Sequence, residues 1–168
     1  GKEYVEKNYT WDIVQEKISE IVNDISFTLQ DEIDVDKHKV ILNNDICVEP
    51  VFDKDAIVVV TAADNSYANY AGITINSIIQ NMSLNDLYDI LVFTNNMSDE
   101  KIIEICSLAE NLSNVSIRFV YVNDVMNTLD INISNNYKIV TYFRLLLQKT
   151  MCNYGKVIYM DSDIIVNN

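Results

Sequence analysis

Glycine, proline and histidine are scarce in this chain of 168 residues, which has three, one and one of them. So few glycines exclude collagen-like and low-complexity architectures. They also cannot supply a glycine-rich phosphate loop, and neither G-x-G-x-x-G nor G-x-x-x-x-G-K-[ST] occurs. The hydrolase motif G-x-S-x-G is absent as well. A single histidine, His38, rules out multi-histidine zinc sites and imidazole-based triads within the chain.

Basic residues and long apolar runs are also few. Twelve Lys and Arg face 25 Asp and Glu, which gives a formal net charge of −13. Such a surface repels phosphate backbones and anionic headgroups, so we expect no nucleic acid partner. No apolar run approaches the ~20 residues of a membrane helix, and the N-terminus lacks the features of a secretory signal. We therefore expect a cytoplasmic protein without a transmembrane segment.

The cysteines and the histidine offer no recognisable metal or redox motif. Cys47, Cys106 and Cys152 are odd in number and far apart, without a C-x-x-C pair. We expect three reduced, partly buried thiols rather than a metal or redox site. His38 lies between two lysines in an acidic stretch, so we expect a solvated side chain rather than a ligand or general base.

The first part of the chain predicts a helix and a linker. Apolar side chains over residues 11–29 recur at spacings of three and four after Thr10, a plausible N-cap. An acid-rich interval follows at residues 31–36. We interpret residues 31–54 as a linker that contains one short strand, Lys39–Leu42.

From residue 55 onward, short β-branched runs alternate with helical spacing. This alternation predicts an open α/β sheet with right-handed crossovers. The expected strands cover residues 56–61, 89–94, 115–122 and 156–160, and the expected helices cover 68–81, 98–110 and 139–151.

Two polar clusters follow expected strands, at the edge where open α/β sheets bind ligands. The first covers residues 62–67 and the second is Asp161-Ser162-Asp163. If the last strand stays extended, the carboxylates of Asp161 and Asp163 lie on one side of it. Together with a diphosphate, two such oxygens can hold Mg²⁺ or Mn²⁺. The alternative is an acidic pair in a solvated loop, and the spacing alone does not separate the two.

Four stretches together resemble the N-terminal half of a family 8 glycosyltransferase, over residues 55–168. They are Ile57–Tyr70, Gly72–Ile79, Thr141–Leu146 and Lys156–Val166, in the family's order. The resemblance implies a GT-A fold, with a Rossmann-like, mostly parallel sheet that is truncated after the D-x-D strand. It also implies a UDP-sugar donor, Mn²⁺ or Mg²⁺ as cofactor, and transfer with retention of configuration.

The resemblance places the nucleotide beside the first cluster. Ala62, Asp64 and Tyr67 match positions that hold uracil and ribose, with Tyr67 stacked on the base. Ala63 and Ser66 belong to the same expected binding loop. Ser66 stands where the family has an amide, which puts that hydrogen bond in question. For Tyr67, packing on the following helix is the alternative.

The resemblance places the diphosphate beside the second cluster. Arg144 matches the arginine beside the donor sugar and diphosphate, whereas Arg118 lies inside an expected strand. Asp161 and Asp163 match the metal-binding pair, and Ser162 between them joins the expected donor site. Arg144, Asp161 and Asp163 are therefore the expected catalytic residues.

The expected activity is transfer of glucose or galactose from a UDP-sugar to a glycan acceptor in bacterial surface polysaccharide or lipopolysaccharide synthesis. Two alternatives stay open: a non-catalytic module that binds nucleotide or cation, and a metal-dependent phosphate hydrolase. The family's third metal ligand and most of its acceptor site match nothing in this chain, so we expect an inactive fragment. An exposed helix or sheet edge would favour a homodimer.

The first helix carries a second, weaker resemblance. Residues 4–18 are similar to the closing helix of family 4 glycosyltransferases of the GT-B type. This implies that residues 1–30 are the tail of an upstream transferase in a two-enzyme fusion. The alternative is an unrelated amphipathic helix that packs on this domain.

Overall fold

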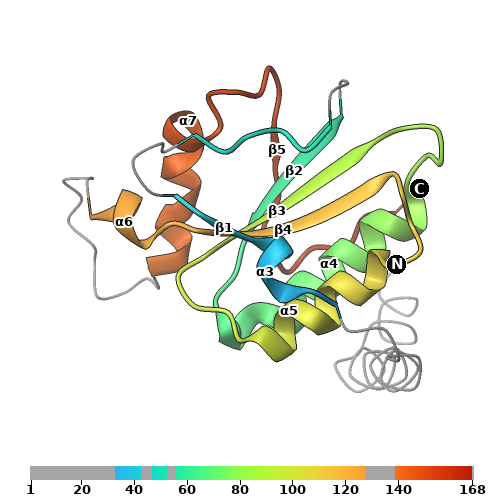
Figure 1. Cartoon of the computed structure of the whole chain (residues 1–168), viewed down its shortest axis with the longest axis horizontal. Coiled ribbons are helices and arrows are strands. Elements are labelled where there is room, and N and C mark those ends of the chain that lie inside the picture. Colours follow the sequence, from blue (N-terminus) through green and yellow to red (C-terminus); the bar gives the residue numbers. More distant parts are fainter. Residues whose placement is uncertain (1–32, 43–46, 53–55, 128–138, 168) are drawn as a thin grey trace, which may run out of the picture. The chain divides into compact units, whose positions relative to one another are not determined.

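The computed structural model of the chain describes residues 33–42, 47–52, 56–127 and 139–167 (Figure 1). The chain divides into two units, Gly1–Ile33 and Asp34–Asn168, and the sheet with its helices belongs to the second. The helix predicted over residues 11–29 lies outside the described residues.

A five-stranded, all-parallel sheet in the order β1-β4-β3-β2-β5 forms the centre of this unit. The strands are β1 (Lys39–Ile41), β2 (Ile57–Ala62), β3 (Tyr88–Thr94), β4 (Val115–Tyr121) and β5 (Ile158–Tyr159). All four strands predicted from residue 55 onward are present. β1 is the short strand expected at Lys39–Leu42, so part of the interval interpreted as a linker belongs to the sheet.

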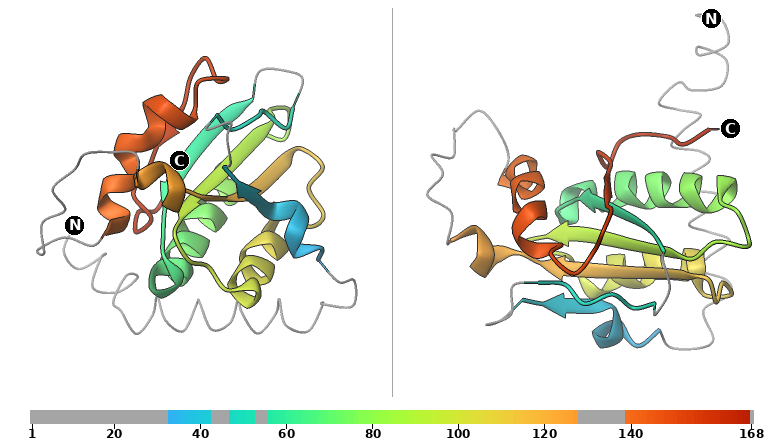
Figure 2. Two further views of the ribbon diagram at one scale, coloured as in Figure 1. Left: turned by 60° about the vertical axis from the view of Figure 1, so that its left-hand side comes forward. Right: turned by 90° about the horizontal axis from the view of Figure 1, so that it is seen from above.

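Helices cover both faces of the sheet. In Figure 1 and in the left view of Figure 2, α4 (Ala68–Asn81) and α5 (Asp99–Cys106) lie on one side of the strands and α7 (Leu147–Thr150) lies on the other. The remaining short elements are α3 (Val35–His38), η1 (Asn65–Tyr67), η2 (Ser107–Ala109), α6 (Asn123–Met126) and η3 (Ile139–Leu146). The helix predicted over residues 139–151 is thus a 3₁₀ segment followed by one α-helical turn.

The sequence pattern explains the placement of the strands and of α5. Every residue of β3 is buried, because this strand has neighbours on both edges and helices on both faces. Ser98 caps α5, since its hydroxyl accepts a hydrogen bond from the backbone nitrogen of Lys101 at 3.4 Å. Phe143 and Leu146 of η3 are fully buried in a core cluster with Leu91 and Phe93 of β3.

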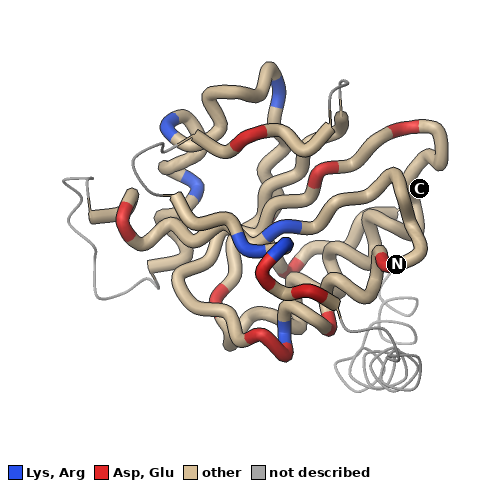
Figure 3. Tube along the Cα trace, in the orientation of Figure 1, with Lys and Arg blue, Asp and Glu red and all other residues tan. Residues whose placement is uncertain are grey.

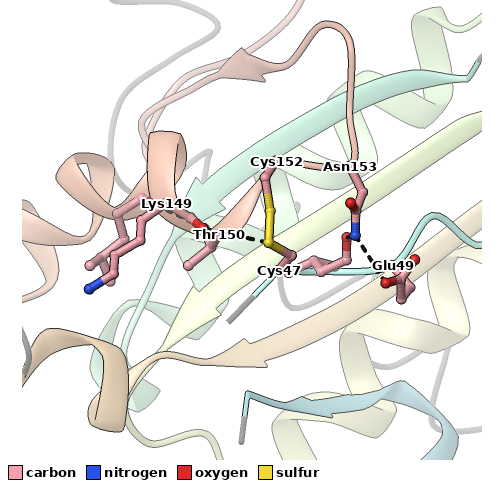
Figure 4. Close-up of a disulfide and its surroundings, with 8 residues drawn as sticks. Cys47, Glu49, Lys149, Thr150, Cys152 and Asn153 are labelled. Carbon is pink, nitrogen blue, oxygen red and sulfur yellow. Dashed lines mark hydrogen bonds between the residues drawn. A yellow bond between two sulfur atoms is a disulfide. The ribbon is translucent and has the colours of Figure 1, made fainter. Parts of the chain in front are cut away.

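The cysteine prediction is wrong for two of the three residues. Cys47 and Cys152 form a disulfide with a Cα–Cα distance of 5.7 Å (Figure 4). Only Cys106 fits the prediction of a buried free thiol, and its burial raises its pKa to about 12. The sequence separation of 105 residues concealed the pairing, because spacing carries no information on contacts made by the fold. The expected cytoplasmic location therefore loses the support of unpaired cysteines.

His38 is not the solvated side chain that its charged neighbours suggested. It is half-buried, and its Nδ1 lies 2.8 Å from the backbone oxygen of Ile117, to which it donates when protonated. The edge position of β1 beside β4 brings the ring to this carbonyl group. His38 is therefore tied to the sheet.

Arg118, Asp89 and Tyr154 form a polar cluster in the interior. Two nitrogens of Arg118 contact the two carboxylate oxygens of Asp89, at 3.2 and 2.6 Å, and the Tyr154 hydroxyl is 2.8 Å from Asp89 Oδ2. Burial would lower the pKa of Arg118, but the Asp89 carboxylate outweighs it and the pKa is raised. Burial, and then the hydrogen bond to Asp89, raise the pKa of Tyr154. Arg118 thus has a structural partner, which agrees with preferring Arg144 as the anion-binding residue.

None of the helices in the described part of the chain has both the length and the apolar character that crossing a membrane requires.

Candidate functional site

The two polar clusters, residues 62–67 and 161–163, lie at the ends of neighbouring strands of the sheet. β2 and β5 are parallel neighbours, with Val60 opposite Tyr159, and the Met160 nitrogen donates to the Val60 oxygen at 2.9 Å. The two chain segments therefore pass the carboxyl edge of the sheet together. This is the edge at which open α/β sheets bind ligands.

The first cluster turns directly from β2 into a 3₁₀ helix. Ala62 and Ala63 are buried, and the Ala63 nitrogen donates to the backbone oxygen of Phe93 at 3.0 Å. Asp64 caps η1, because its Oδ1 accepts from the Tyr67 nitrogen at 3.0 Å and from the Ser66 hydroxyl at 2.6 Å. Ser66 and one oxygen of Asp64 thus stabilise the turn itself, which holds Tyr67 in place at its end.

Tyr67 packs on the following helix, which was the alternative to base stacking in the sequence analysis. Its ring lies against that of Tyr70 on α4, with 5.3 Å between the centroids and 40° between the planes. The residue is nevertheless 37% exposed. The ring thus packs on the following helix, and the residue is partly exposed.

Arg144 and Asp161 come together from different elements. Arg144 lies on η3, and its Nη2 is 3.0 Å from Asp161 Oδ1. Figure 3 shows the Lys and Arg positions of the segment that η3 and α7 form in blue. Its Nε donates to the Thr141 oxygen at 3.1 Å, and its guanidinium lies 5.2 Å from the centroid of the Tyr159 ring. Burial is the main cause that raises the pKa of Tyr159, which flanks this pair on β5. Both charged side chains are about half-exposed, so the pair is accessible to a ligand and weak by itself.

The expectation of an extended strand through Asp161 and Asp163 is wrong. β5 ends at Tyr159, and Ser162 and Asp163 form a turn. Both aspartates are exposed, whereas Ser162 between them is buried. The period-two argument therefore does not apply to their side chains.

The residues that hold this turn were missed by the sequence analysis. Thr74, Ser77 and Asn81 on α4 make hydrogen bonds to the backbone of residues 162–166. This segment continues the chain beside α4 and contains no strand (Figures 1 and 2). α4 also carries Asn69, Asn76 and Gln80, so the polarity of these three side chains alone did not single them out in the sequence.

The donor atoms of the second cluster suit a hard cation. Carboxylate oxygens are ligands that Mg²⁺ and Mn²⁺ prefer, and those of Asp161 and Asp163 are accessible. The described residues contain no group of three or more His, Cys, Asp or Glu that could hold a metal ion. The two aspartates therefore fit a cation whose shell is completed by other oxygens, such as those of a diphosphate and water.

The sheet order and the two clusters define a GT-A glycosyltransferase arrangement, and known structures share it. The apo structure of the bifunctional glycosyltransferase WbbM matches with a TM-score of 0.65 and 35% identity, over 72% of this chain and 21% of that one. The galactosyltransferase LgtC, in complex with donor and acceptor sugar analogues, matches with a TM-score of 0.50 and 24% identity, over 67% of this chain and 40% of that one. At that identity LgtC supports the fold alone.

The family follows from the sequence match. The chain belongs to glycosyl transferase family 8, whose model matches residues 58–168. A comparison with curated proteins found no match. The chain spans about a fifth of the length of WbbM and two fifths of LgtC. Its family makes it a glycosyltransferase domain, which confirms the resemblance found in the sequence.

Proposed function

We propose that this domain takes a hexose, glucose or galactose, from a UDP-sugar and transfers it to a glycan acceptor with retention of configuration. The observation that carries the proposal is the contact between Arg144 and Asp161, 3.0 Å apart, beside the strand that leads into Ala62–Tyr67. A cation-binding carboxylate, an anion-binding guanidinium and a partly exposed aromatic ring thereby share one edge of the sheet. These are the groups that a nucleoside diphosphate sugar requires.

In this proposal each residue has a distinct role toward the donor. Tyr67 stacks on the base, and Ala62, Ala63, Asp64 and Ser66 form the turn beside base and ribose. Asp161 and Asp163 hold Mn²⁺ or Mg²⁺, and Ser162 forms the backbone between them. When bound, the cation supplies Lewis acid stabilisation of the diphosphate. Arg144 adds a positive charge where the leaving group becomes more negative.

The site favours this role over a phosphate hydrolase. A hydrolase would use Asp161 as a nucleophile, yet here its carboxylate is paired with Arg144. An ion-paired carboxylate is a better anchor for a cation and diphosphate than an attacking group. A module that only binds nucleotide would not cleave a UDP-sugar, which the assay of donor consumption below measures.

The setting of the reaction is also a proposal. WbbM, a bifunctional glycosyltransferase, is 35% identical to this chain, which supports a parent protein with two transferases. A role in bacterial surface polysaccharide or lipopolysaccharide synthesis belongs to the same proposal. The β5 edge supports self-association, since Ile158 is 52% exposed there. Size-exclusion chromatography of wild type and Ile158→Lys tests it, and an unchanged elution volume would contradict a dimer through this edge.

Calorimetry with UDP, UDP-glucose, UDP-galactose and ADP, each with and without Mn²⁺, tests the donor site. We expect Mn²⁺-dependent binding of the uridine ligands only. Asp163→Asn should remove the metal dependence, while Asp124→Asn, an exposed aspartate on α6, should leave it intact. Equal UDP affinity with and without metal would refute the metal role. Donor consumption is followed in parallel. Cleavage of a UDP-sugar that is lost in Asp161→Ala excludes a module that only binds nucleotide, whereas uridine binding without cleavage fits both such a module and the inactive fragment expected from the sequence.

A further inference from the structure

The segment that carries the D-x-D turn is held by one face of a helix. After β5 the chain leaves the sheet, and residues 162–166 have no strand partner. Their backbone groups still need hydrogen bonds, above all at Ser162, the buried residue of the segment. Thr74, Ser77 and Asn81 supply them, and their spacing of three and four residues places all three on one side of α4.

Thr74 contacts the backbone on both sides of Asp163. Its hydroxyl oxygen lies 2.9 Å from the Ser162 oxygen and 2.8 Å from the Ile164 oxygen. The one hydroxyl proton is thus shared between the two carbonyl groups that flank the aspartate. Thr74 is 1% exposed and Ser162 is 8% exposed, so water competes little for the contact between them, whereas Ile164 is 37% exposed.

Ser77 and Asn81 extend the same attachment along the helix. The Val166 nitrogen donates to Ser77 Oγ at 3.0 Å, and Asn81 Nδ2 donates to the Val166 oxygen at 3.0 Å. Both side chains are also bonded to α4 itself, because Ser77 donates to the Thr74 oxygen and Asn81 to the Ser77 oxygen. Their orientations are therefore fixed by the helix before they meet the segment.

Packing alone does not account for the hydroxyl of Thr74. Valine fills nearly the same volume and has a similar helix propensity, so a buried helical position without a polar task would accept it. The hydroxyl at this position instead serves the two carbonyl groups around Asp163. Removing it would leave the oxygen of the buried Ser162 short of a donor, which carries a free-energy cost.

We propose that Thr74, with Ser77 and Asn81, is a positioning residue that holds the Asp161-Ser162-Asp163 turn for cation and diphosphate binding. This inference rests on the proposed function of the two aspartates. Both are exposed, so their backbone is the part that the protein can fix in advance. A turn ordered before binding loses less entropy when the ligand arrives.

The test compares Thr74→Val, Thr74→Ser and a matched control, Thr150→Val, in the full chain. Thr150 is also a buried threonine, and its hydroxyl donates to the Leu146 oxygen at 3.0 Å, away from residues 162–166. Calorimetry measures UDP binding with Mn²⁺ and with a chelator. With Mn²⁺, we expect Thr74→Val to bind about tenfold more weakly, the usual effect of losing an outer-shell partner of a metal site. Thr74→Ser should restore the affinity to within about twofold of wild type.

The chelator measurement separates positioning from general damage. In the absence of metal, UDP affinity should be the same in all four proteins, because Tyr67 and its turn are unaltered. An equal loss with and without Mn²⁺ in Thr74→Val, or an affinity equal to that of Thr150→Val, would overturn the inference. If Thr74→Val does not fold, Ser77→Ala decides: several-fold weaker Mn²⁺-dependent binding supports positioning, and wild-type affinity overturns it. Metal-independent UDP binding by the wild type would instead count against the proposed function itself.

Discussion

At the scale of single residues, side chains that bind a ligand and side chains that build the loop are interleaved. Asp64 and Ser66 were expected to contact the nucleotide, yet Ser66 Oγ is 2.6 Å from Asp64 Oδ1 and both support the turn. Tyr67 is the residue of this cluster with an accessible aromatic face. In the proposed donor site, base stacking is therefore assigned to Tyr67.

Tyr67→Ala should weaken UDP binding by about 1–3 kcal/mol, the usual contribution of a base stacked on an aromatic ring. Tyr67→Phe keeps the ring and should retain most of the affinity. Calorimetry at saturating Mn²⁺ measures both variants. An unchanged affinity in Tyr67→Ala would mean that the ring only packs against Tyr70.

The buried pair of Asp89 and Arg118 makes a prediction about stability rather than binding. Asp89 is 1% exposed and Arg118 has no other carboxylate within the described contacts of its side chain. Asp89→Ala leaves a buried guanidinium unpaired and should lower the free energy of unfolding by about 3–5 kcal/mol.

Urea unfolding measures this loss against a matched control. Asp34→Ala breaks a pair with Lys37 in which both side chains are more than half-exposed, so little change is expected there. Similar midpoints of urea unfolding for the two variants would show that the Asp89–Arg118 pair stabilises the fold no more than the exposed pair does.

At the scale of elements, the sequence correctly predicted the helices and strands that are specified by neighbouring residues. α4 was predicted with its observed bounds, and β2, β3 and β4 to within a residue at each end, because continuous apolar runs and caps are read from neighbouring residues. The helix after Ile139 was predicted as α-helical but is largely 3₁₀, and the last strand is shorter than expected. Apolar content at Ile164 and Ile165 suggested a strand, whereas both side chains are exposed beside α4.

In the candidate site, too, some residues were found from local sequence, whereas contacts between distant segments were not. Asp161 and Asp163 were found because strand-end carboxylates stand out in a sequence. The contact of Arg144 with Asp161 and the bonds from Thr74 arise between segments 17 and 88 residues apart. Only the folded sheet brings these segments together, so no spacing rule could have found their contacts.

At the scale of the whole molecule, a covalent bond joins the start and end of the sheet unit. The Cys47–Cys152 disulfide adds to polar contacts between the same segments: the Val48 nitrogen donates to the Thr150 oxygen at 2.7 Å, and Asn153 Nδ2 donates to Glu49 Oε1 at 3.0 Å (Figure 4). The residue after Asn153 belongs to the Asp89 cluster. This region therefore connects the segment before β2 to the loop that precedes β5.

Reduction of the disulfide should lower the free energy of unfolding by about 2–4 kcal/mol, since the bond closes a long loop in the unfolded chain. Urea unfolding with and without reductant measures the effect. Cys47→Ser should match the reduced wild type and no longer respond to reductant. Cys106→Ser removes the buried free thiol and should leave the response to reductant in place. Identical stability of oxidised and reduced wild type would contradict a structural role for the bond.

The division of the chain at Ile33 and Asp34 leads to the last prediction. All of the candidate site residues, the sheet and the polar stripe on α4 lie in the second unit. Removing residues 1–33 should therefore leave Mn²⁺-dependent UDP binding unchanged. It should reduce self-association if the helix predicted over residues 11–29 contributes to it, and leave it unchanged if the β5 edge alone does. Calorimetry and size-exclusion chromatography on the shortened and full chains measure the two effects. If the deletion instead unfolds the remainder, the segment with the helix predicted over residues 11–29 is part of this core, and the proposal that it closes an upstream transferase is refuted.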